Sequence, residues 1–263
     1  MLLNAMSLNN ESVPKVLSAD QPAIFDIDFY AAGTVYHLKS KIAITQVDGF
    51  TKVTIGSETL WKKSATTKVN KSNLFDWDGI EPYRMREDAG EYLPDDVSIT
   101  IALIKQLKRG FNVISRVGLT NYNFFLPRER TVLPEIISIL DPSIEYISVE
   151  ESGDQIKARL KFFGKEELIL NNLGEIEHYL SSGTIKGIGV FEDAIRMLRA
   201  GGYLIIDEIE NHFNQELVAS LLRLFLNEET NPNGAVLVFS THYPELLDEL
   251  ERNDAVFITR HEQ

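Results

Sequence analysis

The sequence predicts an α/β fold with a parallel core sheet, an antiparallel β subdomain and a helical insertion. After residue 180, short apolar segments alternate with helical ones, which is typical of a parallel sheet wrapped by helices. Over residues 22–56, apolar residues recur with a period near two between Gly and Asp turns, as in an antiparallel meander. Within residues 94–140, the stretch "DDVSITIALIKQLKRG" has an Asp cap, helical spacing and a Gly stop.

The individual elements follow in chain order from the same patterns. The meander contains three strands, and the polar residues 57–92 are expected to form an exposed connection. The helical residues 94–140 are expected to project as an arm, and residues 144–163 to form a second hairpin peripheral to the parallel sheet. The remaining elements alternate in type: helix 184–199, strand 203–207, helix 214–227, strand 235–240, helix 244–251 and strand 255–259.

The composition limits the classes of protein to which the chain can belong. Its 263 residues are 44% hydrophobic and 25% charged, and no apolar run approaches the roughly 18 residues of a membrane span. A net charge of -13 disfavours a broad nucleic-acid footprint but leaves a local basic patch open. Without cysteine there is no disulfide framework and no thiolate metal site. The first residues lack a secretory signal, so we expect a cytoplasmic protein.

Strand 203–207 ends in a run of acidic residues. In "GGYLIIDEIENHF", the apolar "YLII" leads directly into Asp207 and Glu208, and Glu210 follows two residues later. The carboxyl end of a strand in a parallel sheet faces the crevice where ligands bind. An Asp there can hold Mg²⁺, and a neighbouring acid can accept a proton from an attacking water. A solvated acidic turn has the same sequence, so the pattern alone leaves both interpretations open.

Two further segments place polar residues beside helix starts. In "LSSGTIKG", Ser181 or Ser182 can cap a helix, and Gly183 lets backbone N–H groups approach an anion. An ordinary helix cap fits this segment as well. In "VLVFSTHYPE", an apolar strand is followed by "STH", which ends at His242. A single His after a strand is often structural, but this strand and the one before Asp207 would direct polar groups to one edge of the sheet.

The order of these three segments resembles that of the ATP-binding-cassette type of ATPase. "LSSGT" resembles its signature motif, "YLIIDE" its Walker B strand and "STH" its switch-histidine loop. The run "LSSGTIKGIGVFEDAIRMLRAGGYLIIDEIENHF" is similar, more specifically, to AAA-type ATPases of the overcoming-lysogeny and abortive-infection kind, whose Walker B is extended as Asp-Glu-x-Glu-Asn. The resemblance covers residues 180–242 and is weaker over residues 1–179. It implies a P-loop NTPase-like fold, with the head of an ABC-type ATPase.

The resemblance also implies roles for individual residues. Asp207 would help to order Mg²⁺, Glu208 would polarise the hydrolytic water, and His242 would contact the γ-phosphate of ATP. In a head-to-tail homodimer, three residues would reach nucleotide bound by the opposite protomer: Ser181, Ser182 and Gly183. The dimer-contacting D-loop would begin at Glu210 and Asn211. The family further implies a possible effector protein as partner and an association with phage defence.

The sequence departs from this family in one motif. No G-x-x-x-x-G-K-[ST] string, the P-loop that cradles phosphates, occurs in the chain. The opening "MLLNAMSL" resembles the helix that follows the P-loop, so we expect the strand and P-loop to lie upstream. Residues 1–263 are then one N-terminally incomplete ATPase domain, inactive alone. Its expected parts are a β-rich subdomain at 1–92, a helical arm at 93–143 and a core at 144–263.

Two other classes of function stay open at the level of sequence. One is a Mg²⁺- or Mn²⁺-dependent hydrolase or nuclease that uses four ligands: Asp207, Glu208, Glu210 and His212. It is weakened because alternate residues of a strand point to opposite faces. The other is a non-catalytic interaction module. The sequence does not decide whether the chain binds nucleic acid, or what ATP turnover would drive.

Overall fold

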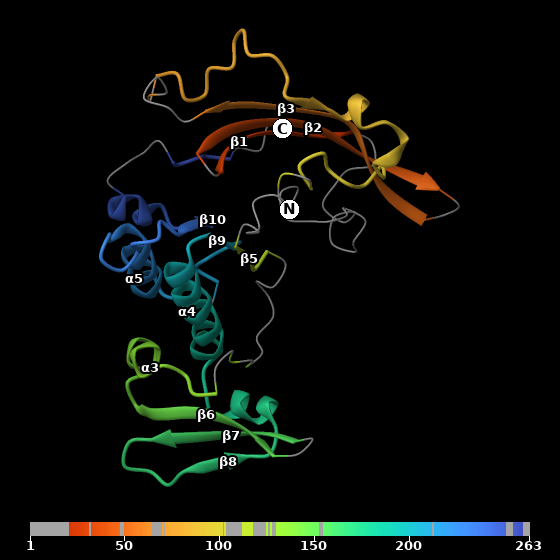
Figure 1. The fold of residues 1–263 in the computed structure, drawn as a ribbon. Coiled ribbons are helices and arrows are strands. Elements are labelled where there is room, and N and C mark those ends of the chain that lie inside the picture. The colour runs from red at the N-terminus through yellow and green to blue at the C-terminus, as the bar shows by residue number, and fades with distance from the viewer. Residues whose placement is uncertain are drawn as a thin grey trace. The chain divides into compact units, whose positions relative to one another are not determined.

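The structure is a computed structural model that describes most of residues 21–259 (Figure 1). Within that span the description omits residues 32, 48–49, 65–69, 71, 102, 104–111, 118–124, 126, 128–129, 153–154, 212 and 251–254. The chain divides into two compact units, Met1–Phe111 and Asn112–Gln263. Among the described residues, no helix is both long enough and apolar enough to span a membrane.

The first unit is built on one antiparallel sheet in the order β1-β2-β3-β4, which confirms the predicted meander. Its strands are β1 (Ala23–Ala31), β2 (Thr34–Val47), β3 (Phe50–Ser64) and β4 (Arg84–Met85). Period-two alternation buries one face, where Leu38 of β2 lies opposite Leu60 of β3 and both are fully buried. Gly33 has a φ of 77° in the turn between β1 and β2, a conformation that favours glycine.

The prediction that residues 57–92 form an exposed connection is wrong at both ends of this range. β3 continues to Ser64, β4 pairs with it, and a 3₁₀ helix, η1, spans Arg86–Tyr92. The polar residues that suggested a loop lie at both exposed and buried positions of a strand: Ser57 and Lys62 are exposed, whereas Glu58 is almost completely buried. A long β3 rich in polar residues therefore has the composition of a loop and the pairing of a strand.

The second unit contains two sheets around one hydrophobic core. The parallel sheet has the order β10-β9-β5 and consists of β5 (Val113–Ser115), β9 (Tyr203–Ile206) and β10 (Val236–Phe239). The antiparallel sheet has the order β6-β7-β8 and consists of β6 (Ile144–Ser152), β7 (Gln155–Phe162) and β8 (Leu168–Leu170). The helices are α3 (Pro134–Leu140), η2 (Leu173–His178), α4 (Ser182–Ala200), α5 (Gln215–Leu226) and η3 (Pro244–Glu249).

Helix α4 crosses the core of this unit between the two sheets (Figure 1). Ile188 and Phe191 are almost completely buried on it, and burying a side chain of this size contributes roughly 1.5–3 kcal/mol. Gly187 lets α3 approach closely, because a Cβ atom there would lie 2.4 Å from Cδ2 of Leu140. The position and length of α4 agree with the predicted helix 184–199.

The parallel pairing of the predicted strands 203–207 and 235–240 is confirmed, but their predicted neighbour is not. β5, which the sequence analysis assigned to helix and loop, pairs with β9 instead. Residues 255–259 form no strand, and Phe257 and Ile258 are 88% and 78% exposed. Their β-rich composition is not matched by a partner strand or a buried face, and strand propensity acts through such contacts.

Two helical predictions are also changed by the structure. Residues predicted as helix 244–251 form the tighter 3₁₀ helix η3 at Pro244–Glu249. Part of the predicted arm at 94–140 lies outside the described residues, and its described part includes α3 and the strand β5. Residues 144–163 form the predicted hairpin as β6 and β7, in a sheet separate from the parallel one.

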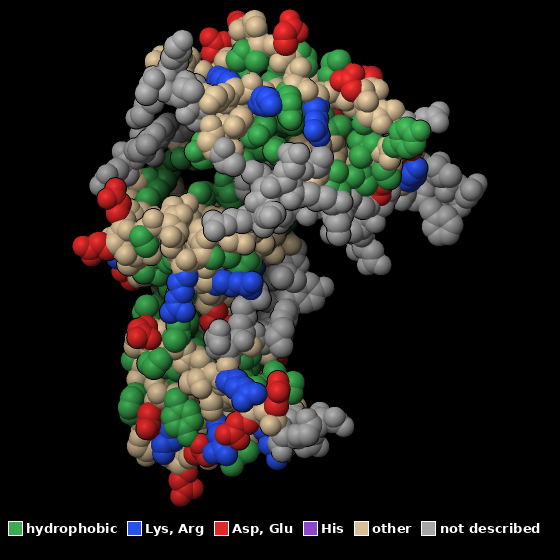
Figure 2. Space-filling view, in the orientation of Figure 1, with side chains coloured by type: hydrophobic (Ala, Val, Ile, Leu, Met, Phe, Trp, Pro, Cys, Tyr) green, Lys and Arg blue, Asp and Glu red, His purple; other side chains and the backbone are tan. Residues whose placement is uncertain are grey.

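Charged side chains of both signs lie intermixed on the face shown in Figure 2, including the region around β6, β7 and β8. There Arg159 makes ion pairs with Glu150 and Glu167, with closest N···O distances of 2.9 and 3.1 Å.

Candidate functional site

The three parallel strands end at one edge of their sheet and bring polar residues together there. The N–H of Arg116, just after β5, donates to the carbonyl of Ile205 at 2.8 Å. The N–H of Ser240, just after β10, donates to the carbonyl of Ile206 at 3.2 Å. Asp207 follows β9 directly, so the ladder itself places Ser240 beside Asp207. The carboxyl edge of a parallel sheet is the usual ligand position in α/β proteins.

Ser240 forms hydrogen bonds with both acidic residues predicted at this edge. Its hydroxyl donates to Oδ1 of Asp207 at 2.6 Å and accepts the backbone N–H of Glu208 at 2.7 Å. Glu208 has a φ of 48°, and no other non-glycine residue in the described part of the chain has a positive φ. That conformation costs about 1–2 kcal/mol, and the hydrogen bond from Glu208 to Ser240 helps to hold it. Ser240 thus orients the side chain of Asp207 and holds the backbone of Glu208.

Glu210 connects the acidic turn to the loop that carries His242. Its Oε1 accepts the backbone N–H of His242 at 2.7 Å, while Oε2 is buried and makes no hydrogen bond within the described residues. Burial raises the pKa of Glu210, but backbone N–H donors, including that of His242, outweigh burial and hold the pKa below its ordinary value. Glu210 is therefore an ionised acceptor that positions the His242 loop.

The turn after β9 is closed by its own backbone. The N–H of Asn211 donates to the carbonyl of Glu208 at 2.9 Å, and the N–H of Phe213 donates to the carbonyl of Glu210 at 2.8 Å. Ile209, fully buried inside the turn, donates its N–H to the carbonyl of Ser240 at 3.0 Å. The predicted residue His212 lies outside the described residues.

The structure brings Asp207, Glu208 and His242 to the same edge, as predicted, and all three are exposed. The other three predicted residues stand at the start of α4. Ser181 caps this helix, since its Oγ accepts the N–H of Thr184 at 3.0 Å. Ser182 and Gly183 form the first turn of the helix, the end of a helix that attracts anions.

Arg116 is a residue of this edge that the sequence analysis missed. Its Nε and Nη2 each lie 2.7 Å from Oδ2 of Asp193, a carboxylate of α4 whose side chain is 1% exposed. Gly189 makes room for the guanidinium, because a Cβ atom there would lie 2.8 Å from Nη2 of Arg116. Two glycines inside a helix, in "GIG", were the available signal that something packs closely on α4.

The edge does not provide a complete metal site from protein side chains alone. Within the described ranges, no group of three or more His, Asp and Glu side chains is arranged to hold a metal ion. Mg²⁺ usually keeps several waters and binds proteins through one or two carboxylates plus substrate phosphates. Asp207, an exposed carboxylate whose Oδ1 is oriented by Ser240, fits that second kind of site.

Fold and edge together define an α/β protein whose polar site follows the strands of a parallel sheet. A family model described as "AAA domain, putative AbiEii toxin, Type IV TA system" matches residues 92–248. This match covers more than half of the chain, and the chain belongs to this family of AAA domains. A search of curated proteins finds no match.

Membership confirms the resemblance seen in the sequence at the level of the family. It implies the P-loop NTPase type of fold and an ATP-binding, ATPase type of function in a toxin–antitoxin or abortive-infection context. The matched residues include the α4 start, the acidic edge after β9 and the His242 loop.

Proposed function

We propose that the chain is the core of an ATPase that binds Mg²⁺ and ATP at the carboxyl edge of β9 and β10. The observation that carries this proposal is the single hydroxyl of Ser240, which holds Asp207 and the backbone of Glu208 within hydrogen-bonding distance. Hydrolysis of a phosphoanhydride uses a metal ligand and a proton acceptor close together, and Asp207 and Glu208 are adjacent and exposed.

Each residue of the edge has a distinct role in this proposal. Asp207 orders Mg²⁺ through its water shell, and the metal neutralises charge on the phosphates when bound. Glu208 accepts a proton from the attacking water, and its exposed side chain can reach solvent. His242 contacts the γ-phosphate from a loop whose backbone is held by Glu210.

The second set of residues acts across a dimer in this proposal. Ser181, Ser182 and Gly183 combine a serine cap with the N-terminus of a helix, whose dipole attracts phosphate. In a head-to-tail homodimer they contact nucleotide bound by the opposite protomer. Dimer formation would then depend on ATP, which makes the protein a nucleotide-dependent switch for an effector, with a role in phage defence.

The 263 residues contain no P-loop motif. Without its backbone cradle and Lys, the acidic edge repels phosphates. β10 is the outermost strand of the parallel sheet, and its residues Val236 and Val238 are 40% and 47% exposed. A further strand carrying a P-loop can pair there and present phosphates beside Asp207 and His242. Residues 1–263 then form a single incomplete ATPase domain (1–92 β-rich, 93–143 helical, 144–263 core).

Calorimetric titration of residues 1–263 with Mg²⁺ and ATP tests this proposal. We expect no micromolar binding and no steady turnover from this chain, and restored binding when the protein is extended by a P-loop segment. Tight binding and turnover by residues 1–263 alone would contradict the assigned site. Metal-dependent cleavage of nucleic acid without nucleotide would favour the hydrolase that uses Asp207, Glu208, Glu210 and His212.

A further inference from the structure

Helix α4 is connected to the acidic turn by one buried side chain, Lys186. This residue lies in the second turn of α4 and is 8% exposed. Its Nζ donates a hydrogen bond of 2.8 Å to the carbonyl oxygen of Asn211. The same Nζ lies 5.9 Å from the centre of the ring of Phe213, within the range of a cation–π contact.

The backbone that Lys186 holds is the turn that carries Glu208. The N–H of Asn211 donates to the carbonyl of Glu208, so the peptide groups around Asn211 are bonded both to Glu208 and to Lys186. Burial lowers the pKa of Lys186 and the charge of Arg116 lowers it further, while Glu208 and Glu210 act in the opposite direction. The carboxylates of the turn are thus close enough to interact with the buried ammonium.

An ammonium group at this position is not explained by packing. The neighbouring positions of α4 are occupied by buried apolar residues such as Ile185 and Ile188, and an apolar side chain would fill the same space without the penalty of burying charge. What the amine adds is a hydrogen bond with a defined direction. That bond fixes the position of the turn relative to the helix, whereas an apolar side chain would only pack against the turn.

We propose that Lys186 is a positioning residue that couples the Ser181–Gly183 end of α4 to the Glu208 turn. Lys186 lies five positions after Ser181, about 7.5 Å along the helix axis, so a shift at the helix start is carried directly to the amine. The functional meaning rests on the proposed function. In a head-to-tail dimer the helix start serves the nucleotide of one site and Glu208 serves that of the other, so Lys186 links the two sites within one protomer.

Native-state amide hydrogen exchange tests this coupling in the full chain without any nucleotide. In Lys186→Met, which keeps the apolar stem and removes the donor, we expect the amides of Asn211 and Phe213 to exchange about tenfold faster, as for loss of one charged hydrogen bond. Lys186→Arg, which keeps a cationic donor, should restore much of the protection. Arg196→Met, at an exposed position of the same helix, is the matched control and should leave both amides unchanged.

A double-mutant cycle then separates coupling from simple stability. Ser181→Ala removes the helix cap, and we expect it to speed exchange of the Asn211 amide in the parent chain but to have little further effect in Lys186→Met. An equal effect of Ser181→Ala in both backgrounds would overturn the proposal, as would faster exchange spread evenly over the whole unit. Both measurements are made without ATP, so failure of ATP binding would remove the proposed function and leave the coupling standing.

Discussion

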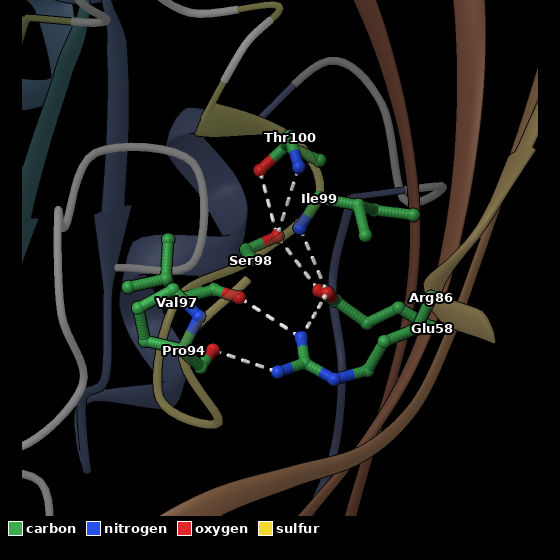
Figure 3. A network of polar contacts seen from close by, with 7 residues as sticks. All are labelled: Glu58, Arg86, Pro94, Val97, Ser98, Ile99 and Thr100. Carbon is green, nitrogen blue, oxygen red and sulfur yellow. Dashed lines mark hydrogen bonds and ion pairs between the residues drawn. The ribbon is translucent and has the colours of Figure 1, made fainter. Parts of the chain in front are cut away.

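The buried carboxylate of Glu58 and the exposed carboxylates of Asp207 and Glu208 are held in opposite ways. Glu58, on β3 of the first unit, has a side chain that is 0% exposed and accepts bonds from Ser98 Oγ at 2.7 Å and from the N–H of Ile99 at 2.9 Å (Figure 3). Arg86 completes the set at 3.3 Å. At the edge of β9, by contrast, Ser240 holds Asp207 by one carboxylate oxygen and Glu208 by its backbone N–H.

The contrast separates structural carboxylates from those available for chemistry. Arg86 also donates to the carbonyls of Val97 at 2.9 Å and Pro94 at 2.8 Å, so Glu58 organises the chain that follows η1 (Figure 3). A buried charge surrounded by donors of its own unit stabilises the fold only while the set is complete. The exposed carboxylates of Asp207 and Glu208 lie instead where a metal ion or a water can reach them from solvent.

The largest effect is expected from Glu208→Gln in a version of the protein that carries a P-loop. The amide keeps the size of the side chain and the backbone bond to Ser240 but cannot accept the proton, so hydrolysis should fall by ~10²–10⁴-fold while ATP binding is retained. Turnover and binding would be measured in parallel. Glu229→Gln, in the exposed turn after α5, is the control, and equal turnover in Glu208→Gln and parent would remove Glu208 from the mechanism.

Glu58→Ala should give the next largest effect, on stability rather than on catalysis. It leaves Arg86, whose side chain is 13% exposed, without its carboxylate, and breaking a buried ion pair in this way costs roughly 3–5 kcal/mol. Chemical denaturation followed by circular dichroism would measure the loss. Glu87→Ala, at the exposed position beside Arg86, should change little. A loss for Glu58→Ala no larger than for this control would mean that the network of Figure 3 does not stabilise the first unit.

The strength of the local pattern explains which parts of the molecule the sequence predicts. The apolar strands β9 and β10 and helix α4 are strong local patterns, and they were placed correctly within one or two residues. β5 is three residues long and becomes a strand through pairing with β9, so its own sequence carries little signal. The strand character of residues 57–64 was hidden because the segment is rich in polar residues, and the burial of Glu58 among them depends on partners outside the segment.

The sequence predicts which residues lie at the acidic edge, but not the hydrogen bonds that connect them. Asp207, Glu208 and His242 were selected because acids and a histidine follow apolar strands. The bridging role of Ser240 depends on the register between β9 and β10, which brings together residues 33 positions apart. No local pattern encodes that register, and the same holds for Lys186 and Asn211, which are 25 positions apart.

Ser240→Ala tests the comparison directly, because it removes hydrogen bonds at the acidic edge and keeps both acidic residues. Loss of the hydroxyl removes the bonds to Oδ1 of Asp207 and to the N–H of Glu208, so we expect hydrolysis by the P-loop-containing protein to fall about tenfold, as for one net hydrogen bond. Ser240→Thr, which keeps the hydroxyl, should retain most activity. If Ser240→Ala hydrolysed ATP as fast as the parent, the orientation of these two acids would not depend on Ser240.

The smallest effect concerns pH and the bond between Glu210 and the His242 loop. Because the pKa of Glu210 is lower in the folded protein than in the unfolded chain, its contribution to stability is fully present above the ordinary carboxyl pKa of about 4.5 and is lost as pH falls through the lowered value. Exchange of the His242 amide should therefore be slow at neutral pH and speed up in acid, before the unit as a whole unfolds. Glu210→Gln keeps an acceptor oxygen without a titrating charge, so the acid-dependent loss of protection should disappear in that variant. Identical pH profiles for Glu210→Gln and the parent would show that the charge of this carboxylate does not hold the loop.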